Sequence, residues 1–320
     1  MSQRPFAVVT GGSNGIGLEL AREFATHGYD VLIAAEDEAN LREARDDLQR
    51  SGPGAAIETH ASDLASEAGV DALIAVLKGR TIDAAAINAG VGLGGEFVET
   101  DLRRELRMID LNCRGAVQLA KHVAQVMVIR GQGRILFTSS IAATMPDPFE
   151  AVYGATKVFL RWFAQGLREE LKDTGVTVTA LMPSTTETNF FRRAQMMDTR
   201  AGNMKKDDPA IVAKAGFEAL LAGRDRAIPT FKNKVLVAIA DSLPDTLGAK
   251  QHRSLSEPGS ADPQPSSKLP LALGVAAAGL GLALFANWSG SKTDGAPRDT
   301  DARDVEPLIE RLEHEEETLG

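Results

Sequence analysis

The sequence lacks two features that would indicate an exported protein. It has one cysteine, Cys113, which excludes an intramolecular disulfide and a cysteine-rich zinc site, and we expect no metal ligands elsewhere. The first residues, MSQRPFAVVTGG, lead directly into a strand-like run and lack the apolar core of a secretory signal. A reducing compartment, the cytoplasm, is therefore the predicted location.

Basic charge is also scarce. The chain has 35 Lys and Arg against 44 Asp and Glu, a formal net charge of −9. Residues 287–320 hold 10 acidic and 4 basic side chains, so most of the excess lies in this segment. Because binding to a phosphate backbone needs a basic surface, nucleic acid is not expected as a partner.

What the sequence does have is an alternation of short apolar runs and longer segments with helical periodicity. We expect strands at 6–10, 31–35, 57–61, 83–88, 134–139 and 176–182, and a short seventh at 227–229. We expect helices at 16–27, 38–51, 66–79, 101–130, 153–174 and 208–222. Continuous apolar strands are typical of parallel sheets covered on both faces. With right-handed crossovers, the pattern predicts an α/β fold with a Rossmann-type, doubly wound parallel sheet.

The C-terminal part departs from this pattern. We expect one main domain at 1–256, a Pro/Ser-rich linker at 257–268, an apolar helix at 269–288 and an acidic tail at 289–320. Residues 269–286 carry no charged side chain and would span about 27 Å as a helix, just enough to cross a membrane. Basic residues before this stretch would keep the main domain cytoplasmic. The alternative is a helix docked on the main domain or on a second subunit.

A glycine-rich loop follows the first predicted strand. Residues 10–17 read TGGSNGIG and open a helix, which is typical of a loop that binds the pyrophosphate of a dinucleotide. The same residues also satisfy GxSxG, the nucleophile motif of serine hydrolases, with Ser13 as nucleophile. That interpretation is disfavoured, because only one strand precedes Ser13 and the late histidines, His252 and His314, lie near the linker or in the tail.

A second constellation begins where the fifth predicted strand ends. Ser140 is followed after 13 residues by Tyr153, and Lys157 lies four residues further on. Residues four apart share one helix face, and an ammonium beside a phenol favours the ionised phenol, so we expect Lys157 to lower the pKa of Tyr153. Ser140, at the carboxyl end of a parallel strand, would face the ligand-binding crevice.

These motifs together resemble the short-chain dehydrogenase/reductase family over roughly residues 5–230. The resemblance implies an NAD(P)-dependent oxidoreductase that moves hydride between a nicotinamide and an alcohol or carbonyl compound. It implies a catalytic set in which Tyr153 is the acid/base, Lys157 and Ser140 assist it, and Asn112 supports Lys157. It implies that the cofactor is bound by Gly11, Ser13, Asn14, Gly15, Ile16, Gly17, Asp63, Leu64, Asn88, Ala89, Gly90, Pro183 and Thr188, together with Tyr153 and Lys157. Ser184 departs from the family's PGxxxT segment, and dimers or tetramers through the two long helices are expected.

Cofactor and substrate preference depend on fewer residues. Glu36, at the end of the second strand, would accept from a ribose hydroxyl and repel a 2′-phosphate, so NAD is favoured over NADP. Apolar side chains around 184–208 and before Tyr153 favour a medium or bulky apolar substrate; they are Phe190, Phe191, Met196, Met197, Met145 and Phe149. The alternative function is a noncatalytic nucleotide-binding or scaffold protein on the same fold.

The membrane interpretation of 269–286 makes a direct prediction. Deleting residues 265–320 should move the protein from the membrane fraction to the supernatant of lysed cells, because the uncharged stretch is lost. Deleting only 289–320 is the matched control and should leave the distribution unchanged. A full-length chain that is already wholly in the supernatant contradicts the anchor.

Overall fold

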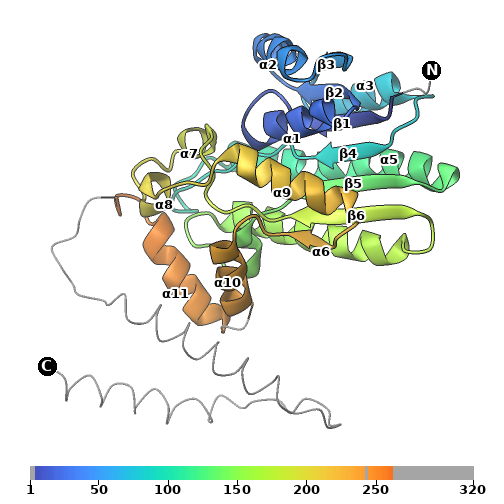
Figure 1. Cartoon of the computed structure of the whole chain (residues 1–320). Helices are drawn as coiled ribbons and strands as arrows, with labels where there is room; N and C mark the ends of the chain where they lie inside the picture. The colour runs from blue at the N-terminus through green and yellow to red at the C-terminus, as the bar shows by residue number, and fades with distance from the viewer. Residues whose placement is uncertain (1–3, 242–243, 262–320) are drawn as a thin grey trace, which may run out of the picture. The chain divides into compact units, whose positions relative to one another are not determined.

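The computed structural model describes residues 4–241 and 244–261, and these form a seven-stranded sheet with helices on both faces (Figure 1). The strands are β1 (Phe6–Thr10), β2 (Asp30–Ala35), β3 (Ile57–Ala61), β4 (Ala84–Ile87), β5 (Gly133–Thr138), β6 (Val176–Leu181) and β7 (Arg226–Ala227). Their order is β3-β2-β1-β4-β5-β6-β7, and every neighbouring pair is parallel. The predicted α/β, Rossmann-type doubly wound sheet is therefore confirmed.

Two apolar layers hold the sheet between its helices, because the central strands are buried on both faces. One layer packs against α1 (Gly15–Thr26), α2 (Glu38–Ser51) and α9 (Pro209–Leu221). The other packs against α3 (Glu67–Leu77), α5 (Ala116–Arg130) and α6 (Ala151–Glu170). In the first layer the rings of Phe24 and Phe217 meet edge to face at 5.1 Å, which joins α1 to α9.

The helix predicted at 101–130 is confirmed, and it contains a wider turn that the sequence did not indicate. The structure has α4 (Leu102–Ile109), a π-helical turn at Asp110–Gly115, and then α5. Asn112 lies in this wide turn, fully buried, and its side chain bonds to the backbone of Val91 on another segment. Such turns are common at functional sites, where they redirect one side chain without ending the helix.

The segment after Pro229, to which the sequence assigned no regular element, is largely helical. It forms α10 (Phe231–Ala240) and α11 (Asp245–Ser256). Residues 257–261 lie beside α8 (Arg200–Asn203) and the residues before it, where the amide of Ala261 donates to the Asp198 carbonyl at 2.9 Å and the amide of Arg200 donates to the Ser260 hydroxyl at 3.0 Å. Short helices α7 (Phe190–Arg193) and the 3₁₀ turn η2 (Ile141–Thr144) complete this end of the molecule. Figure 1 shows α7, α8 and α11 gathered at one end of the sheet, away from the N-terminus.

The predicted linker from residue 262 onward, the apolar helix and the acidic tail lie outside the described residues. Within 4–241 and 244–261, none of the helices has the length and apolar character needed to cross a bilayer.

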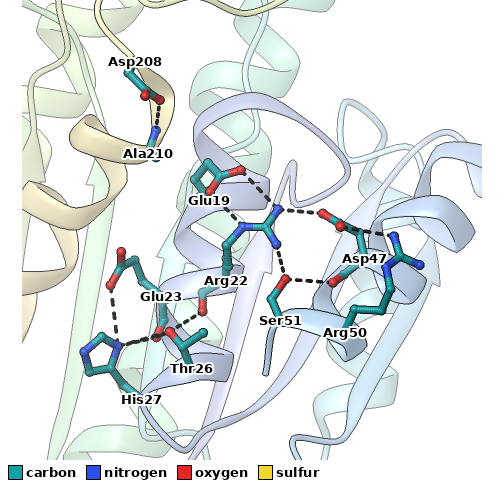
Figure 2. A network of polar contacts seen from close by, with 10 residues as sticks. All are labelled: Glu19, Arg22, Glu23, Thr26, His27, Asp47, Arg50, Ser51, Asp208 and Ala210. Carbon is teal, nitrogen blue, oxygen red and sulfur yellow. Dashed lines mark hydrogen bonds and ion pairs between the residues drawn. The ribbon is translucent and has the colours of Figure 1, made fainter. Parts of the chain in front are cut away.

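A polar network joins α1 to α2 on the surface (Figure 2). The guanidinium of Arg22 bonds to Glu19 at 2.9 Å, to Asp47 at 2.6 Å and to the hydroxyl of Ser51. The hydrogen bond from Arg22 is the largest influence on Asp47 and holds the pKa of its carboxyl below the usual value. Arg22 therefore links α1 to α2, two helices that cover the same face of the sheet.

We expect Arg22→Ala to lower the free energy of unfolding by about 1 kcal/mol, since the contacts with Asp47 and Ser51 that join α1 to α2 are lost, together with the pair that Arg22 forms with Glu19 within α1. Arg42→Ala removes an exposed pair with Glu38 within α2 and should cost under about 0.5 kcal/mol. Urea unfolding at several pH values measures both effects.

The pH dependence of this difference has a definite sign. The pKa of Asp47 is lower in the folded than in the unfolded protein. Its contribution to the free energy of unfolding is therefore complete above the unfolded-state pKa of about 3.9, and it is lost as the pH falls through the folded-state pKa. The difference in free energy of unfolding between wild type and Arg22→Ala should therefore become smaller as the pH is lowered. An equal decrease in the free energy of unfolding for Arg22→Ala and Arg42→Ala at pH 7 would contradict this role of Arg22.

Candidate active site

The glycine loop between β1 and α1 is built for close approach of a ligand to the backbone. Gly11 has a φ of 66°, which side-chain-bearing residues rarely adopt. A Cβ on Gly17 would lie 2.1 Å from the Gly11 carbonyl oxygen, so only glycine closes this turn. The loop thus presents the amino-terminal end of α1, a favourable site for an anionic pyrophosphate.

Side-chain hydrogen bonds tie the carboxyl ends of three central strands together. The Thr10 hydroxyl accepts from the amides of Asn88 and Ala89 at 2.9 and 3.0 Å, and the Asn88 side chain donates to the Thr10 carbonyl at 3.1 Å. Thr138 donates its hydroxyl hydrogen to the Asn88 side chain at 2.9 Å. β1 and β4 are adjacent although the strand order reverses between them, and ligands of such sheets bind in the crevice there.

A cavity of about 860 Å³ opens at this crevice and extends to α10 and α11. It is lined by every residue predicted to bind the cofactor, including Glu36, and by three of the four predicted catalytic residues, Ser140, Tyr153 and Lys157. The glycine cradle, the volume and the polar groups fit a dinucleotide with room for a second molecule.

Ser140, Tyr153 and Lys157 come together at the ends of β5 and α6. The side chains of Ser140 and Tyr153 both line the cavity, and Ser140 is close enough to the phenol to act on its pKa. Lys157 donates from Nζ to the Thr138 carbonyl at 3.0 Å and lies 5.6 Å from the centre of the Tyr153 ring. The structure therefore brings a hydroxyl donor, a phenol and an ammonium to one wall of the cavity.

The expected lowering of the Tyr153 pKa is not found. Burial raises the pKa of Tyr153, and the nearby charge of Glu150 raises it further, whereas the Ser140 hydroxyl acts in the opposite direction. Burial also lowers the pKa of Lys157 to about 8. Attraction between the phenolate and the ammonium favours the charged form of both groups. The loss of solvent on burial disfavours it and is the larger effect here. The phenol therefore holds its proton at neutral pH.

Asn112 lies behind this wall and does not line the cavity. Its side chain is fully buried, and it donates to the Val91 carbonyl at 2.9 Å and to the Thr156 hydroxyl at 3.0 Å. A Cβ on Gly90 would lie 3.1 Å from Asn112 Oδ1 and 3.2 Å from Lys157 Nζ, so both groups approach the same backbone. Support of Lys157 by Asn112 remains a prediction.

The sequence missed Arg107 at the far end of the cavity. Its guanidinium pairs with Asp63 at 2.9 Å and with Glu36 at 3.1 Å, and it lowers the pKa of the Asp63 carboxyl against the effect of burial. Arg107 is on α4, far in sequence from both carboxylates. No pattern in the sequence around Arg107 indicated that its side chain would reach Asp63 and Glu36.

The loop at 184–208 contributes only part of the expected apolar wall. Phe190 and Phe191 line the cavity, and the rings of Phe190 and Tyr153 are 5.2 Å apart. Met196 is instead buried in a separate cluster with Phe191, and Met197 is half exposed. Before Tyr153, Met145 lines the cavity but Phe149 does not.

The departure at Ser184 does not disturb the turn that precedes this loop. Ser184 needs no glycine-like backbone, since positive φ among non-glycine residues of the described chain is confined to Phe149 and Gln195. The Ser184 carbonyl accepts a hydrogen bond from the Thr186 hydroxyl at 2.8 Å. Pro183 and Thr188 on either side both line the cavity.

Within residues 4–241 and 244–261, Ser13 has no partner that would make it a nucleophile. Its hydroxyl accepts from the Asn14 side chain at 3.2 Å, and no described histidine bonds to it. His252 contacts Asp147 instead, at 2.5 Å. The serine hydrolase interpretation therefore has no structural support.

The sequence also did not indicate a buried polar cluster beside Tyr153. Asp147 and Glu150 precede Tyr153, and His252 and Ser256 reach them from α11. Glu150, His252 and Ser256 line the cavity. The sequence placed His252 beside the linker, and nothing in the local pattern indicated that α11 packs over this loop.

Comparisons with known proteins agree with this geometry. The family model for short chain dehydrogenase matches residues 5–198. An uncharacterized oxidoreductase of Staphylococcus saprophyticus is 32% identical over 220 residues, covering 68% of this chain and 92% of that protein.

Solved structures show the same fold. A short-chain dehydrogenase from Sphingobium yanoikuyae in complex with NADPH has a TM-score of 0.66 at 24% identity, covering 93% of this chain and 100% of that one. One from Burkholderia phymatum in complex with NAD has a TM-score of 0.67 at 23% identity, covering 74% and 92%. The chain belongs to the short-chain dehydrogenase family and is an oxidoreductase of the NAD(P)-dependent type.

Proposed function

We propose that this protein transfers hydride between a nicotinamide cofactor and an apolar, medium-sized alcohol or ketone, with Tyr153 as the acid/base. The observation that carries the proposal is the convergence of Ser140, Tyr153 and Lys157 on the cavity that begins at the glycine loop. These groups supply a donor to a substrate oxygen, a transferable proton and a nearby ammonium. A noncatalytic binding protein would need none of them in this arrangement.

A bound nicotinamide would supply or accept the hydride, and the residues of this chain would manage the oxygen and its proton. The hydroxyls of Ser140 and Tyr153 would hold the substrate oxygen between them. During reduction Tyr153 gives its proton to that oxygen, and during oxidation it takes the proton back. Burial keeps the phenol protonated at neutral pH, which favours its role as donor to a carbonyl. Lys157 would hold the nicotinamide ribose and stabilise the phenolate that forms.

The substrate class follows from the part of the cavity beyond Tyr153. Its walls are mostly apolar and come from η2, α7, α8, α10 and α11; they include Met145, Phe190, Met204, Leu236, Val237 and Leu255. A small charged substrate would leave these side chains facing water. An apolar compound of medium size would bury them, which favours its binding.

NAD is proposed as the preferred cofactor because two carboxylates, those of Glu36 and Asp63, lie where the adenosine ribose would bind. Arg107 pairs with both and leaves Glu36 largely exposed to the cavity. A 2′-phosphate would have to compete with these carboxylates for the Arg107 guanidinium.

Assembly into a homo-oligomer through the long helices is part of the proposal. On α6 the side chains of Trp162 and Phe159 are exposed, and on α4 those of Leu102 and Leu106 are exposed. Apolar side chains grouped on helices in this way support contact with a second copy of the chain.

Tyr153→Phe should reduce turnover by about 10²-fold or more with apolar ketones, because the transferable proton is lost. Cofactor affinity should be retained. Tyr29→Phe is the matched control, since Tyr29 is the chain's other tyrosine and packs on Phe24 away from the cavity. Cofactor absorbance measures turnover, and fluorescence titration measures affinity. A wild-type protein that binds cofactor but turns over nothing in a broad alcohol and ketone screen would favour the noncatalytic alternative.

Glu36→Ala should shift the ratio of kcat/KM values toward NADP by about tenfold, equivalent to ~1.4 kcal/mol. The change removes the repelling carboxylate and leaves Arg107 with one partner fewer. Glu38→Ala removes a neighbouring exposed carboxylate that pairs with Arg42, so it should leave the ratio unchanged. Wild-type preference for NADP would overturn the assignment.

A further inference from the structure

Three potential metal ligands converge beside the catalytic tyrosine. One ligand atom from each of Asp147, Glu150 and His252 lies within 4.8 Å of the other two. Glu150 and His252 line the cavity, so the cluster borders the space proposed for the substrate. None of the three is used by the hydride-transfer mechanism.

The local chain holds the two carboxylates firmly. Asp147 lies between Pro146 and Pro148, and Phe149 follows with a φ of 64°, which turns Glu150 back toward Asp147. Gly154 packs so closely on Asp147 that a Cβ there would lie 2.5 Å from the Asp147 Cβ. The aspartate therefore has little room to move away.

The cluster holds more buried negative charge than its surroundings balance. Asp147 and Glu150 are each only 6% exposed. His252 lies 2.5 Å from Asp147 Oδ1, but Asp147 Oδ2 has no hydrogen-bond partner in the described part of the chain. In that same part, no Lys or Arg forms an ion pair with either carboxylate. Burying two neighbouring carboxylates without a balancing cation is costly. A bound cation would remove this cost.

The arrangement does not form a serine nucleophile. Ser256 and Asp147 approach the same nitrogen of His252, Nδ1, at 3.4 and 2.5 Å. A catalytic triad needs the serine on one ring nitrogen and the carboxylate on the other. Ser256 instead donates its hydroxyl hydrogen to Glu150 Oε2 at 3.1 Å and so orients that carboxylate.

We propose that Asp147, Glu150 and His252 bind one divalent transition-metal ion, such as Zn²⁺ or Mn²⁺. One imidazole nitrogen and two carboxylate oxygens are a ligand set typical of these ions. Three protein ligands leave further coordination positions for water or a substrate, and two of the three ligands, Glu150 and His252, line the cavity. The ion would also join α11 to the loop that leads into α6.

Calorimetric titration of the full-length protein with Zn²⁺ and with Mn²⁺, after dialysis against a chelator, tests the proposal. We expect one ion per chain, and at least tenfold weaker binding for His252→Gln and for Glu150→Gln. His27→Gln is the matched control, because His27 faces Glu23 at 3.5 Å as an exposed histidine–carboxylate pair. It should bind as wild type does.

A second measurement does not depend on any variant. Cobalt(II) added to the dialysed wild-type protein should give a visible absorption spectrum of a protein-bound ion, which Zn²⁺ then displaces. Absence of saturable binding by wild type overturns the proposal, and so does unchanged binding by a folded His252→Gln protein. Neither result bears on the role of Tyr153, which the turnover of Tyr153→Phe decides separately.

Discussion

The hydroxyl of Thr10 is the contact on which the site depends. It accepts hydrogen bonds from two successive amides at the end of β4, and it does so at the point where the strand order reverses. Without it, two partly buried amides at the end of β4 would lose their hydrogen-bond partner, which is costly. With it, the glycine loop, the segment from Asn88 to Gly90 and the end of β5 keep fixed positions around one crevice. The sheet thus positions the glycine loop independently of the side chains that line the rest of the cavity.

The cavity wall formed by Ser140, Tyr153 and Lys157 carries an electrostatic cost. Tyr153 and Lys157 are both buried. Burial raises the pKa of Tyr153 and lowers the pKa of Lys157, so the neutral form of each is favoured. The wall is held by contacts to backbone, including Lys157 with the Thr138 carbonyl and Ser139 with the Lys157 carbonyl. Fixed, partly desolvated groups of this kind interact strongly with charge that develops on a substrate oxygen.

Motifs with a fixed local geometry could be predicted from the sequence, and long-range contacts could not. The glycine loop, Ser140 and the Tyr153–Lys157 pair each follow from a strand end or a helix turn, and the structure brings them together. Arg107 and His252 reach the cavity from helices whose packing angles no local pattern encodes. The sign of the Tyr153 pKa shift was wrong for the same reason, because burial is a property of the whole fold. The π-helical turn was missed because Asn112 reaches Val91, a partner 21 residues away.

The cavity is built from two stretches of the chain. The glycine loop, the Ser140, Tyr153 and Lys157 side chains and part of the apolar wall lie within residues 5–198, which the family model matches, whereas α10 and α11 lie after them. The last two helices thus complete a wall that the matched stretch forms in part. Substitutions in α10 and α11 would change the shape of the cavity without touching Tyr153, so this architecture allows the selectivity of the cavity to change while its reactive side chains stay the same.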